Sequence, residues 1–423
     1  MKGGIEMLRY IIKGGNKLEG EVKISGSKNA SLPIIAATIL NSGKSTLYNV
    51  PNIHDTQMMF EILKKLGGKI EKKNNKIIID TSKTNKFEIP EDLMRQMRSS
   101  VILVGGLLGK HRKATFSYPG GCDIGARPID LHLKSFEKLG INITKNYGNI
   151  SCICDKIEGE KIDLDFPSVG ATENIMLASV LAVGTTVINN AAREPEIVDL
   201  QKFLNKMGAK IKGAGSNKIE IQGVRNLKDV SYNIMPDRIE AGTFLCATAI
   251  TSGNTKLVDL NSEHITPVIT KLEEAGCKLK VDKKTIEIIG PKRLKAIDLK
   301  TMPYPGFPTD MQSIMATTLT VAKGTSVIVE NIFENRFKYM QELNRMGAKI
   351  STEGKTAVIK GVRKLYGANV KATDLRGGAS MVIAGLVAKE ITTVENIEYI
   401  LRGYENFENK LFKLNANIRK EEI

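Results

Sequence analysis

The sequence predicts an α/β fold in which one β-α-β-α-β-β unit of about 70 residues occurs six times, with three units in each of two domains. Three observations predict it. A short phrase that ends one helix and starts a strand recurs six times, each repeat contains a second helix of small and aliphatic residues, and a short strand follows most of these second helices. Self-similarity at a fixed period indicates that each repeat folds as one supersecondary unit.

The recurring phrase, seen for example as LKKLGGKI and LNRMGAKI, marks the end of a helix. Its Gly, replaced by Asn in the last copy, suits the left-handed conformation that closes many helices. A strand is expected directly after it. The six copies occupy residues 63–70, 136–143, 204–211, 272–279, 343–350 and 411–418.

The second helix of each unit is apolar on most of its faces, which predicts that it is buried. Three buried helices in a group make one compact core, so six of them predict two domains. Short strands such as TLYNV, KLVDL and SVIVE follow. The buried helices are expected at residues 29–40, 99–109, 171–184, 241–253, 311–324 and 378–390.

The composition is typical of a soluble globular protein with a basic surface. The chain has 423 residues, of which 42% are hydrophobic, and a net charge of +16. This charge raises the alternative of a basic nucleic-acid-binding repeat protein. The lysines are spread along the chain and are not interleaved with aromatic residues, which favours a solvated surface instead.

The expected compartment is the cytoplasm. The N-terminus lacks the apolar core of a signal peptide, and no run approaches the ~20 apolar residues of a membrane helix. The five cysteines show no paired spacing, which indicates a reducing environment. We expect no nucleic-acid partner and no membrane partner.

Polar and charged residues gather directly before the buried helices. Helix N-termini offer free N–H groups and a positive dipole end, so several facing one cleft would hold anions. Carboxylates among them suit acid–base work, although capping also explains an Asp or Ser at a helix start. Lys28 and Arg376 oppose the dipole and therefore point more strongly to function. The set comprises Lys28, Asn29, Arg98, Ser168, Asp237, Asp310, Asp374 and Arg376.

Other motifs carry little chemistry. NSGKST at 41–46 lacks the first Gly of a phosphate-binding loop and follows a helix instead of preceding one. Cys152, Cys154, Cys246 and Cys277 lie in strand or helix patterns that predict core positions. The four histidines have no ligand spacing, so we predict no metal and no cofactor.

Cys122 is different, because it lies in the glycine-rich stretch YPGGCDIGARP at 118–128. The cation of Arg127 favours a lowered thiol pKa, and the carboxylate of Asp123 favours a raised one. The surrounding glycines allow close approach to a ligand. A thiol here suits a nucleophile or a general acid, and the spacing leaves both open.

Seven segments, in order along the chain, resemble the UDP-N-acetylglucosamine 1-carboxyvinyltransferase family, the enolpyruvyl transferases of peptidoglycan synthesis. They are ISGSKNASLP, YPGGCDIGARPIDLH, AAREPEIVDL, MPDRIEAGTF, FPTDMQ, FENRF and ATDLRGGAS. The resemblance runs nearly end to end and implies an inside-out α/β barrel fold with two domains. It assigns residues 27–235, including the Cys122 loop, to one domain and residues 1–26 and 236–423 to the other. The active site is expected in the cleft between them.

The resemblance also implies the reaction. The 3′-hydroxyl of UDP-N-acetylglucosamine adds to C2 of phosphoenolpyruvate while C3 is protonated, which gives a tetrahedral phospho-ketal. Loss of phosphate and of a C3 proton then yields the enolpyruvyl ether. This is the first committed step of peptidoglycan synthesis, so it serves cell-wall biogenesis, cell shape and cell division, and fosfomycin targets it.

By the same resemblance, Cys122 is the proton donor and can form a covalent adduct with phosphoenolpyruvate, and Asp310 is the base. Lys28 and Arg402 complete the catalytic set, and Asp374 is a further carboxylate. Phosphoenolpyruvate contacts are expected from Lys28, Asn29, Arg127, Arg336, Arg376 and Arg402. Contacts to the UDP-sugar are expected from Arg98, Arg127, Pro128, Ile129, Asp130, Leu131, Ser168, Val169, Gly170, Asp310 and Ile332. We expect a monomer that needs no cofactor.

A sister enzyme, 3-phosphoshikimate 1-carboxyvinyltransferase, shares this architecture and is the alternative. The pair Asn29-Ala30 and the loop with Cys122 are absent from the sister's motifs and favour the UDP-sugar enzyme. Phe166 departs from the pattern, because some members carry a basic residue there, near the nucleotide. The glycine-rich loop is expected to close as a lid over bound sugar nucleotide.

Overall fold

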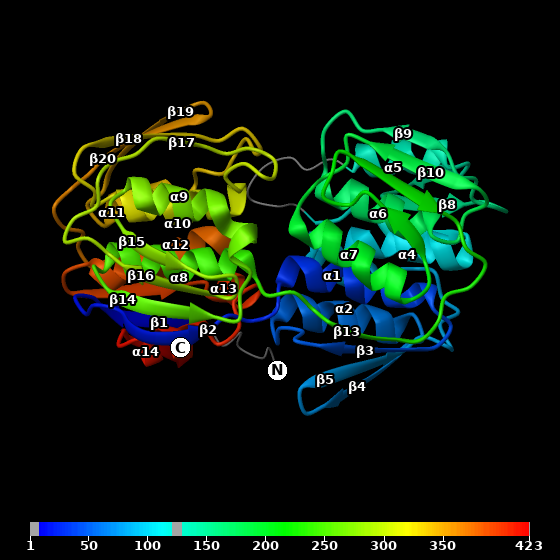
Figure 1. The fold of residues 1–423 in the computed structure, drawn as a ribbon, viewed down its shortest axis with the longest axis horizontal. Helices are drawn as coiled ribbons and strands as arrows, with labels where there is room; N and C mark the ends of the chain where they lie inside the picture. The colour runs from blue at the N-terminus through cyan, green and yellow to red at the C-terminus, as the bar shows by residue number, and fades with distance from the viewer. Residues whose placement is uncertain (1–7, 121–128, 423) are drawn as a thin grey trace. The chain divides into compact units, whose positions relative to one another are not determined.

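The computed structural model describes residues 8–120 and 129–422 and divides the chain into two compact units (Figure 1). The terminal unit joins the N-terminal segment, up to Ser25, to the chain from Pro236 onward. The central unit holds the described residues from Gly26 to Met235. Each unit has three sheets around a set of buried helices.

The central unit is built around α1 (Lys28–Ala37), α4 (Ile102–His111) and α6 (Val169–Ser179). One sheet has the strand order β13 (Val230–Asn233), β3 (Lys44–Tyr48), β5 (Lys76–Asp80), β4 (Lys69–Lys73). The second is β6 (Lys113–Ser117), β8 (Asn149–Ile153), β7 (Asn142–Asn146), and the third is β11 (Lys210–Lys212), β12 (Lys218–Gln222), β10 (Thr185–Asn189), β9 (Lys161–Asp163). The other helices are α2 (His54–Lys65), α3 (Glu91–Gln96), α5 (Asp130–Lys138) and α7 (Pro195–Lys206).

The terminal unit is built around α8 (Arg238–Ile250), α10 (Gln312–Leu319) and α12 (Leu375–Val387). One sheet has the order β15 (Lys278–Val281), β16 (Thr285–Ile289), β14 (Asn254–Val258), β2 (Glu19–Lys23). The second is β17 (Leu299–Lys300), β18 (Thr325–Val329), β20 (Thr356–Lys360), β19 (Lys349–Glu353), and the third is β21 (Asn369–Lys371), β22 (Ile391–Glu395), β1 (Leu8–Lys13), β23 (Asn417–Glu422). The other helices are α9 (Thr266–Glu274), α11 (Tyr339–Arg345), α13 (Glu398–Leu401) and α14 (Phe407–Lys413).

The six expected buried helices are all present among the described residues, and their burial is as predicted. Every residue of α8, for example, is buried. The six expected helix ends also adopt the left-handed conformation. Their φ angles are 101° at Gly67, 81° at Gly140, 104° at Gly208, 100° at Gly276, 89° at Gly347 and 73° at Asn415. The β-α-β-α-β-β repeat predicted from the sequence is therefore confirmed, apart from one strand in the second unit and one in the sixth.

Two features of the repeats were not predicted. Strands from distant parts of the chain complete some sheets: β2 pairs in parallel with β14, β1 lies between β22 and β23, and β13 pairs in parallel with β3. The second repeat has only three strands, and a single bridge between Glu88 and Thr115 takes the place of the fourth. Pro90 follows two residues after Glu88 and lacks the N–H that a longer strand would need.

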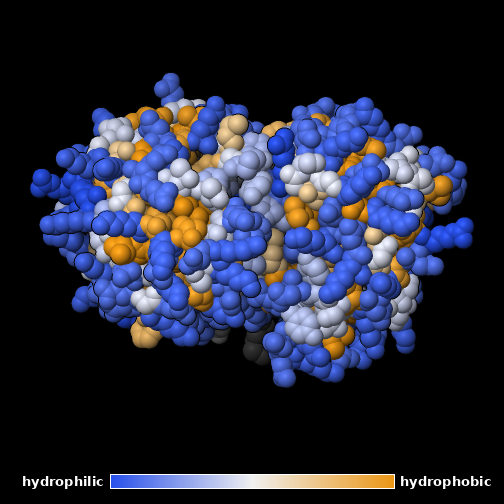
Figure 2. All heavy atoms as spheres, in the orientation of Figure 1, coloured by the Kyte–Doolittle hydropathy of each residue, from blue (hydrophilic) through white to orange (hydrophobic). Residues whose placement is uncertain are grey.

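The cores of both units are largely aliphatic, and each lies between the buried helices and the sheets. Cys152, Cys154, Cys246 and Cys277 are buried there, as predicted. Desolvation raises the pKa of the Cys246 thiol to about 12, which makes it a poor nucleophile. The surface in view is mostly hydrophilic (Figure 2). Within residues 8–120 and 129–422, no helix has the length and apolar character to cross a membrane.

Candidate active site

In the central unit, the start of α1 presents a charged side chain that is largely buried. Ser27 caps the helix, and its Oγ accepts a hydrogen bond from the N–H of Ala30 at 3.3 Å. Lys28 follows, with a side chain only 11% exposed, and its Nζ lies 2.7 Å from Oδ2 of Asp55. Asp55 lies in the first turn of α2 and is fully buried. The ion pair holds the Lys28 ammonium at a helix N-terminus, where anions bind.

A buried polar network around Asn174 joins three segments that are expected to contact the UDP-sugar. Oδ1 of Asn174, on α6, accepts a hydrogen bond from the N–H of Gly105 on α4 at 2.7 Å. Its Nδ2 donates to the carbonyl of Val101 at 3.0 Å and lies 2.7 Å from Nδ1 of His132 on α5. Arg98 begins the same 3₁₀ turn as Val101. The network therefore fixes how the three helices pack.

The other expected contacts of this unit lie at the ends of these helices. Ser168 caps α6 through a 3.3 Å hydrogen bond from the N–H of Ala171, and Val169 is the first helical residue. At Gly170 an added Cβ would come within 3.2 Å of the His132 ring, so a larger residue would require this ring to shift by a few tenths of an ångström. Ile129, Asp130 and Leu131 lie at the start of α5, next to His132.

In the terminal unit, Asp310 lies between two buried arginines. Nη2 of Arg336 donates to its Oδ1 at 2.9 Å, and Nη2 of Arg376 donates to its Oδ2 at 3.1 Å. The two arginine side chains are 4% and 3% exposed, whereas that of Asp310 is 29% exposed. Desolvation alone would raise the pKa of Asp310, but the two guanidinium groups outweigh it and hold that pKa well below its usual range.

Both arginines keep donors that the carboxylate does not use. Nη1 of Arg336 and Nη1 of Arg376 are buried, and neither has a hydrogen-bond partner among the residues that the structure describes. Buried guanidinium N–H groups are costly to leave unmatched. The arrangement suits a small anion with several oxygens, such as a phosphate or a carboxylate.

The start of α12 fixes the position of Arg376. Asp374 caps this helix and accepts hydrogen bonds from the N–H groups of Arg376 at 2.9 Å and Gly377 at 3.1 Å. The guanidinium carbon of Arg376 lies 5.2 Å from the centre of the Tyr404 ring, within cation–π range. Asp374 therefore acts here as a helix cap that orients Arg376.

The predicted site residues thus form two groups, one in each unit. Lys28, Asn29, Arg98, Ile129, Asp130, Leu131, Ser168, Val169 and Gly170 belong to the central unit, and Asp310, Ile332, Arg336, Asp374, Arg376 and Arg402 to the terminal unit. Cys122, Arg127 and Pro128 lie outside the described residues. Sequence reasoning brought Asp310, Arg336 and Arg376 into one site, and the structure places them in contact.

Sequence reasoning missed four residues that support these groups, namely Asp55, Asn174, Glu330 and Tyr404. Asp55 carried a usable signal, because an acidic residue in the first turn of a helix can pair with a nearby cation. Asn174 and Tyr404 lie in apolar stretches and gave no sign of their partners. Glu330 directly follows the strand β18.

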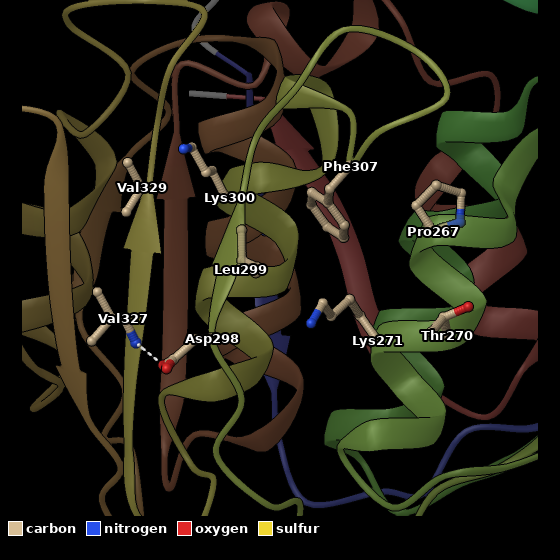
Figure 3. Close-up of a pocket in the computed structure, with 9 residues that line it drawn as sticks. All are labelled: Pro267, Thr270, Lys271, Asp298, Leu299, Lys300, Phe307, Val327 and Val329. Atoms are coloured by element: carbon tan, nitrogen blue, oxygen red, sulfur yellow. Dashed lines mark hydrogen bonds between the residues drawn. The ribbon is translucent and has the colours of Figure 1, made fainter.

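A cavity of about 660 Å³ lies elsewhere in the terminal unit, between α9 and the strands β17 and β18 (Figure 3). Lys271, Leu299, Phe307 and Val329 are among its lining residues, and none of the predicted site residues that the structure describes lines it. Within the described part of the chain, no group of His, Cys, Asp and Glu has the arrangement of a metal site.

Comparisons with known proteins agree with the fold and with the resemblance. The family model of EPSP synthase (3-phosphoshikimate 1-carboxyvinyltransferase) matches residues 12–411. The enolpyruvyl transferase NikO from Streptomyces tendae has a similar structure, with a TM-score of 0.88, 23% sequence identity, and coverage of 99% of this chain and 100% of that one. At that identity, the likeness shows the fold alone, and it confirms the predicted enolpyruvyl transferase fold.

Curated relatives are far more similar in sequence. UDP-N-acetylglucosamine 1-carboxyvinyltransferase 2 from Caldanaerobacter subterraneus subsp. tengcongensis is 54% identical over 413 residues, which is 97% of this chain and 99% of that protein. UDP-N-acetylglucosamine 1-carboxyvinyltransferase 1 from the same organism is 51% identical, over 98% of this chain and 99% of its own length. Because this identity extends over nearly the whole length of both proteins, the chain belongs to the UDP-N-acetylglucosamine 1-carboxyvinyltransferase family of enolpyruvyl transferases.

Proposed function

We propose that this protein transfers the enolpyruvyl group of phosphoenolpyruvate to the 3′-hydroxyl of UDP-N-acetylglucosamine and releases phosphate. Relatives that carry this activity in their names are 54% and 51% identical over almost the full length, which supports the UDP-sugar as acceptor. The reaction is the first committed step of peptidoglycan synthesis, and we place it in the cytoplasm. The protein would act as a monomer and without a cofactor.

The observation that carries the proposal is the pair of buried arginines around Asp310. Phosphoenolpyruvate bears a phosphate and a carboxylate, and both anions match the guanidinium donors of Arg336 and Arg376 that the Asp310 carboxylate does not use. We assign the remaining contacts to phosphoenolpyruvate to Lys28, Asn29, Arg127 and Arg402. These cations also stabilise the charge of the leaving phosphate.

In this proposal, Asp310 is the base that accepts the proton of the 3′-hydroxyl. Two guanidinium groups hold its pKa well below the usual range, so the free enzyme contains a weak base. An anionic substrate would draw both arginines toward its own oxygens. We expect the Asp310 carboxylate to gain basicity when phosphoenolpyruvate binds.

Addition and elimination then follow with a balanced exchange of protons. The 3′-oxygen forms a bond to C2 and gives its proton to Asp310, while Cys122 donates a proton to C3. The C2–O bond to phosphate then breaks, the Cys122 thiolate takes a proton back from C3, and the double bond is restored. The proton held by Asp310 leaves with the phosphate, so both groups return to their starting states. The role of Cys122 rests on the family motif YPGGCDIGARP, as does the capacity of this thiol to form an adduct.

The UDP-sugar contacts are assigned to segments of the central unit. The Asn174 network joins three segments that carry assigned contacts. Arg98 lies on the first segment, residues 129–131 on the second, and Ser168 and Gly170 on the third. Arg127, Pro128, Val169, Asp310 and Ile332 complete the assignment. The predicted domain division, with a site in the cleft between the domains, is part of this proposal.

Phosphate release tests the function. We expect release from wild-type protein only when phosphoenolpyruvate and UDP-N-acetylglucosamine are both present, and a loss of at least about 100-fold in Cys122→Ala. Cys246→Ala removes a buried thiol and is the matched control. Release with shikimate 3-phosphate in place of the UDP-sugar would contradict the proposal and favour the sister reaction, whose name the family model carries.

Mass spectrometry tests the assignment of the thiol. After treatment with phosphoenolpyruvate or fosfomycin, the intact protein should gain one adduct, and peptide mapping should place it on Cys122. An adduct on any other cysteine would contradict the assignment while leaving the overall reaction intact.

A further inference from the structure

We infer that Glu330 is a positioning residue for the reaction, on the basis of the function proposed above. Its buried carboxylate forms hydrogen bonds to two loops of the terminal unit and thereby connects them. One loop carries Asp310, and the other carries Ile332 and Arg336. Among the assigned substrate contacts, Glu330 touches only the backbone N–H of Ile332, so it acts by holding these loops in place.

Glu330 lies where β17 and β18 end. Figure 3 shows Val329 of β18, Lys300 of β17 and Phe307 at the same end of the cavity. Glu330 is the residue directly after Val329 and is 1% exposed. Its carboxylate is therefore shielded from water, next to the point where both loops begin.

The two carboxylate oxygens divide their hydrogen bonds between the loops. Oε1 accepts from the N–H of Ile332 at 2.8 Å, from the N–H of Phe333 at 3.2 Å and from the hydroxyl of Thr301 at 2.8 Å. Oε2 accepts from the hydroxyl of Thr309 at 2.9 Å. Hydrogen bonds to a charged acceptor are stronger than neutral ones, so these four contacts favour a single arrangement.

Two of these partners, Thr309 and Ile332, connect Glu330 to residues of the proposed chemistry. Thr309 immediately precedes Asp310 and starts the same 3₁₀ turn, Thr309–Met311. Ile332 is an assigned contact to the UDP-sugar. Asp310 in turn accepts a hydrogen bond from Arg336, which belongs to the second loop. The loops are thus joined twice, by Asp310 with Arg336 at the site and by Glu330 with Thr309 behind it.

Thr301, the residue after β17, adds further hydrogen bonds to the start of the second loop. Its hydroxyl donates to Glu330 and accepts from the N–H of Asn331 at 2.9 Å, and its carbonyl accepts from Nδ2 of Asn331 at 3.0 Å. The start of the second loop is therefore held against the start of the first. A displacement of about 1 Å at such supporting contacts is enough to impair catalysis strongly.

Three variants test the inference through the separation of kcat from KM. Glu330→Ala leaves two backbone N–H groups and two hydroxyls without their acceptor, and we expect kcat to fall about 100-fold and KM for UDP-N-acetylglucosamine to rise about tenfold. Glu330→Gln keeps a carbonyl oxygen in the place of Oε1, and Thr309 can rotate its hydroxyl to accept from the amide. We expect this variant to retain kcat within about threefold.

Thr309→Val removes only the bond to the Asp310 loop, with little change in shape. We expect kcat to fall about tenfold while KM for the UDP-sugar changes less than about threefold, a split that a merely structural role would not produce. The matched control is Glu353→Ala, at an exposed position at the end of β19 in the same sheet, and it should retain wild-type kinetics.

The outcomes separate this inference from the proposed function. If wild-type protein does not release phosphate from phosphoenolpyruvate with UDP-N-acetylglucosamine, the proposed function fails. If wild-type protein is active and Thr309→Val and Glu330→Ala match it in kcat and KM, only the positioning role of Glu330 fails. Should Glu330→Ala not fold, wild-type kcat in Thr309→Val alone overturns the inference.

Discussion

At the scale of single residues, the proposed reaction gives Asp310 two functions that oppose each other. Asp310 neutralises two buried guanidinium groups, and in the proposal it also accepts a proton, which the same two groups make difficult. In Asp310→Asn the amide oxygen can accept from one arginine, but the other arginine faces an N–H group. We expect kcat for phosphate release to fall by about 10²–10⁴-fold, because the general base is lost.

A matched substitution separates this loss from a general effect of removing a carboxylate. Asp259 forms an ion pair with Lys23 at 2.9 Å and is largely exposed, and its φ of 58° is one that Asn tolerates well. Asp259→Asn should keep wild-type steady-state kinetics. If Asp310→Asn retains kcat within about threefold and its circular dichroism spectrum is unchanged, Asp310 is not the base.

The sequence was informative about residues whose type alone was unusual at their position. Arg376 and Lys28 stood out because a cation at a helix start opposes the dipole, and both proved to be buried and ion-paired. The supporting partners gave no such sign. Asn174 and Glu330 are ordinary at their positions. Their importance comes from hydrogen bonds to residues that are distant along the chain and to backbone groups, and a periodic sequence pattern does not encode such hydrogen bonds.

At the scale of secondary-structure elements, the repeat was predictable because it depends on local chemistry. A Gly or Asn at a suitable position predicts the end of a helix, and a run of apolar residues predicts a buried helix. Both signals lie within a short stretch of sequence. The completion of sheets by β1, β2 and β13 was not predictable in this way. Pairing between strands far apart in the chain is decided by the packing of the whole unit, and no short stretch records it.

The packing of α4, α5 and α6 offers a prediction at this scale. Asn174→Ala removes the partner of the Gly105 N–H and of the Val101 carbonyl, both in a buried region. We expect a loss of about 2–4 kcal/mol in the free energy of unfolding. Because the three helices position the assigned UDP-sugar contacts, KM for UDP-N-acetylglucosamine should rise about tenfold, with a smaller change in KM for phosphoenolpyruvate.

Asn205→Ala is the control for Asn174→Ala. Asn205 also forms two hydrogen bonds to backbone, with the carbonyl and the N–H of Ile211 at 2.8 and 2.9 Å, but it lies at the end of α7. We expect it to lose stability without a change in either KM. Denaturant unfolding and steady-state kinetics measure the two effects, and equal KM values in both variants would contradict the role of the Asn174 network.

At the scale of the whole molecule, the chain passes between the two units at two neighbouring points. Near Gly26 and Pro236 the two segments run together, with hydrogen bonds from the N–H of Ser27 to the carbonyl of Met235 at 2.8 Å and from the N–H of Asp237 to the carbonyl of Ser25 at 2.9 Å.

In the terminal unit, Glu240 forms a hydrogen bond to the segment at Ser25, where the chain passes to the central unit. Its Oε2 accepts a hydrogen bond from the N–H of Ser25 at 2.7 Å, and its Oε1 lies 2.6 Å from Nζ of Lys410. Desolvation raises the pKa of Glu240 from 4.5 to about 7, and the contact with Lys410 only partly offsets this effect. The folded protein therefore binds a proton at Glu240 in a pH range where the unfolded chain has released it.

This shift predicts a pH dependence of stability with a definite sign. Where the folded state binds more protons than the unfolded state, the free energy of unfolding falls as pH rises. The contribution of Glu240 is fully present below about pH 4 and is lost as pH rises through about 7, and it amounts to at most about 3 kcal/mol. Glu240→Gln cannot ionise, so its unfolding free energy should fall less than that of wild type between pH 4.5 and 7.5. Glu353→Gln, at an exposed position, is the control, and its unfolding free energy should follow the wild-type dependence on pH. If the unfolding free energies of Glu240→Gln and wild type change in parallel with pH, Glu240 is ionised in the folded protein and forms a charged pair with Lys410.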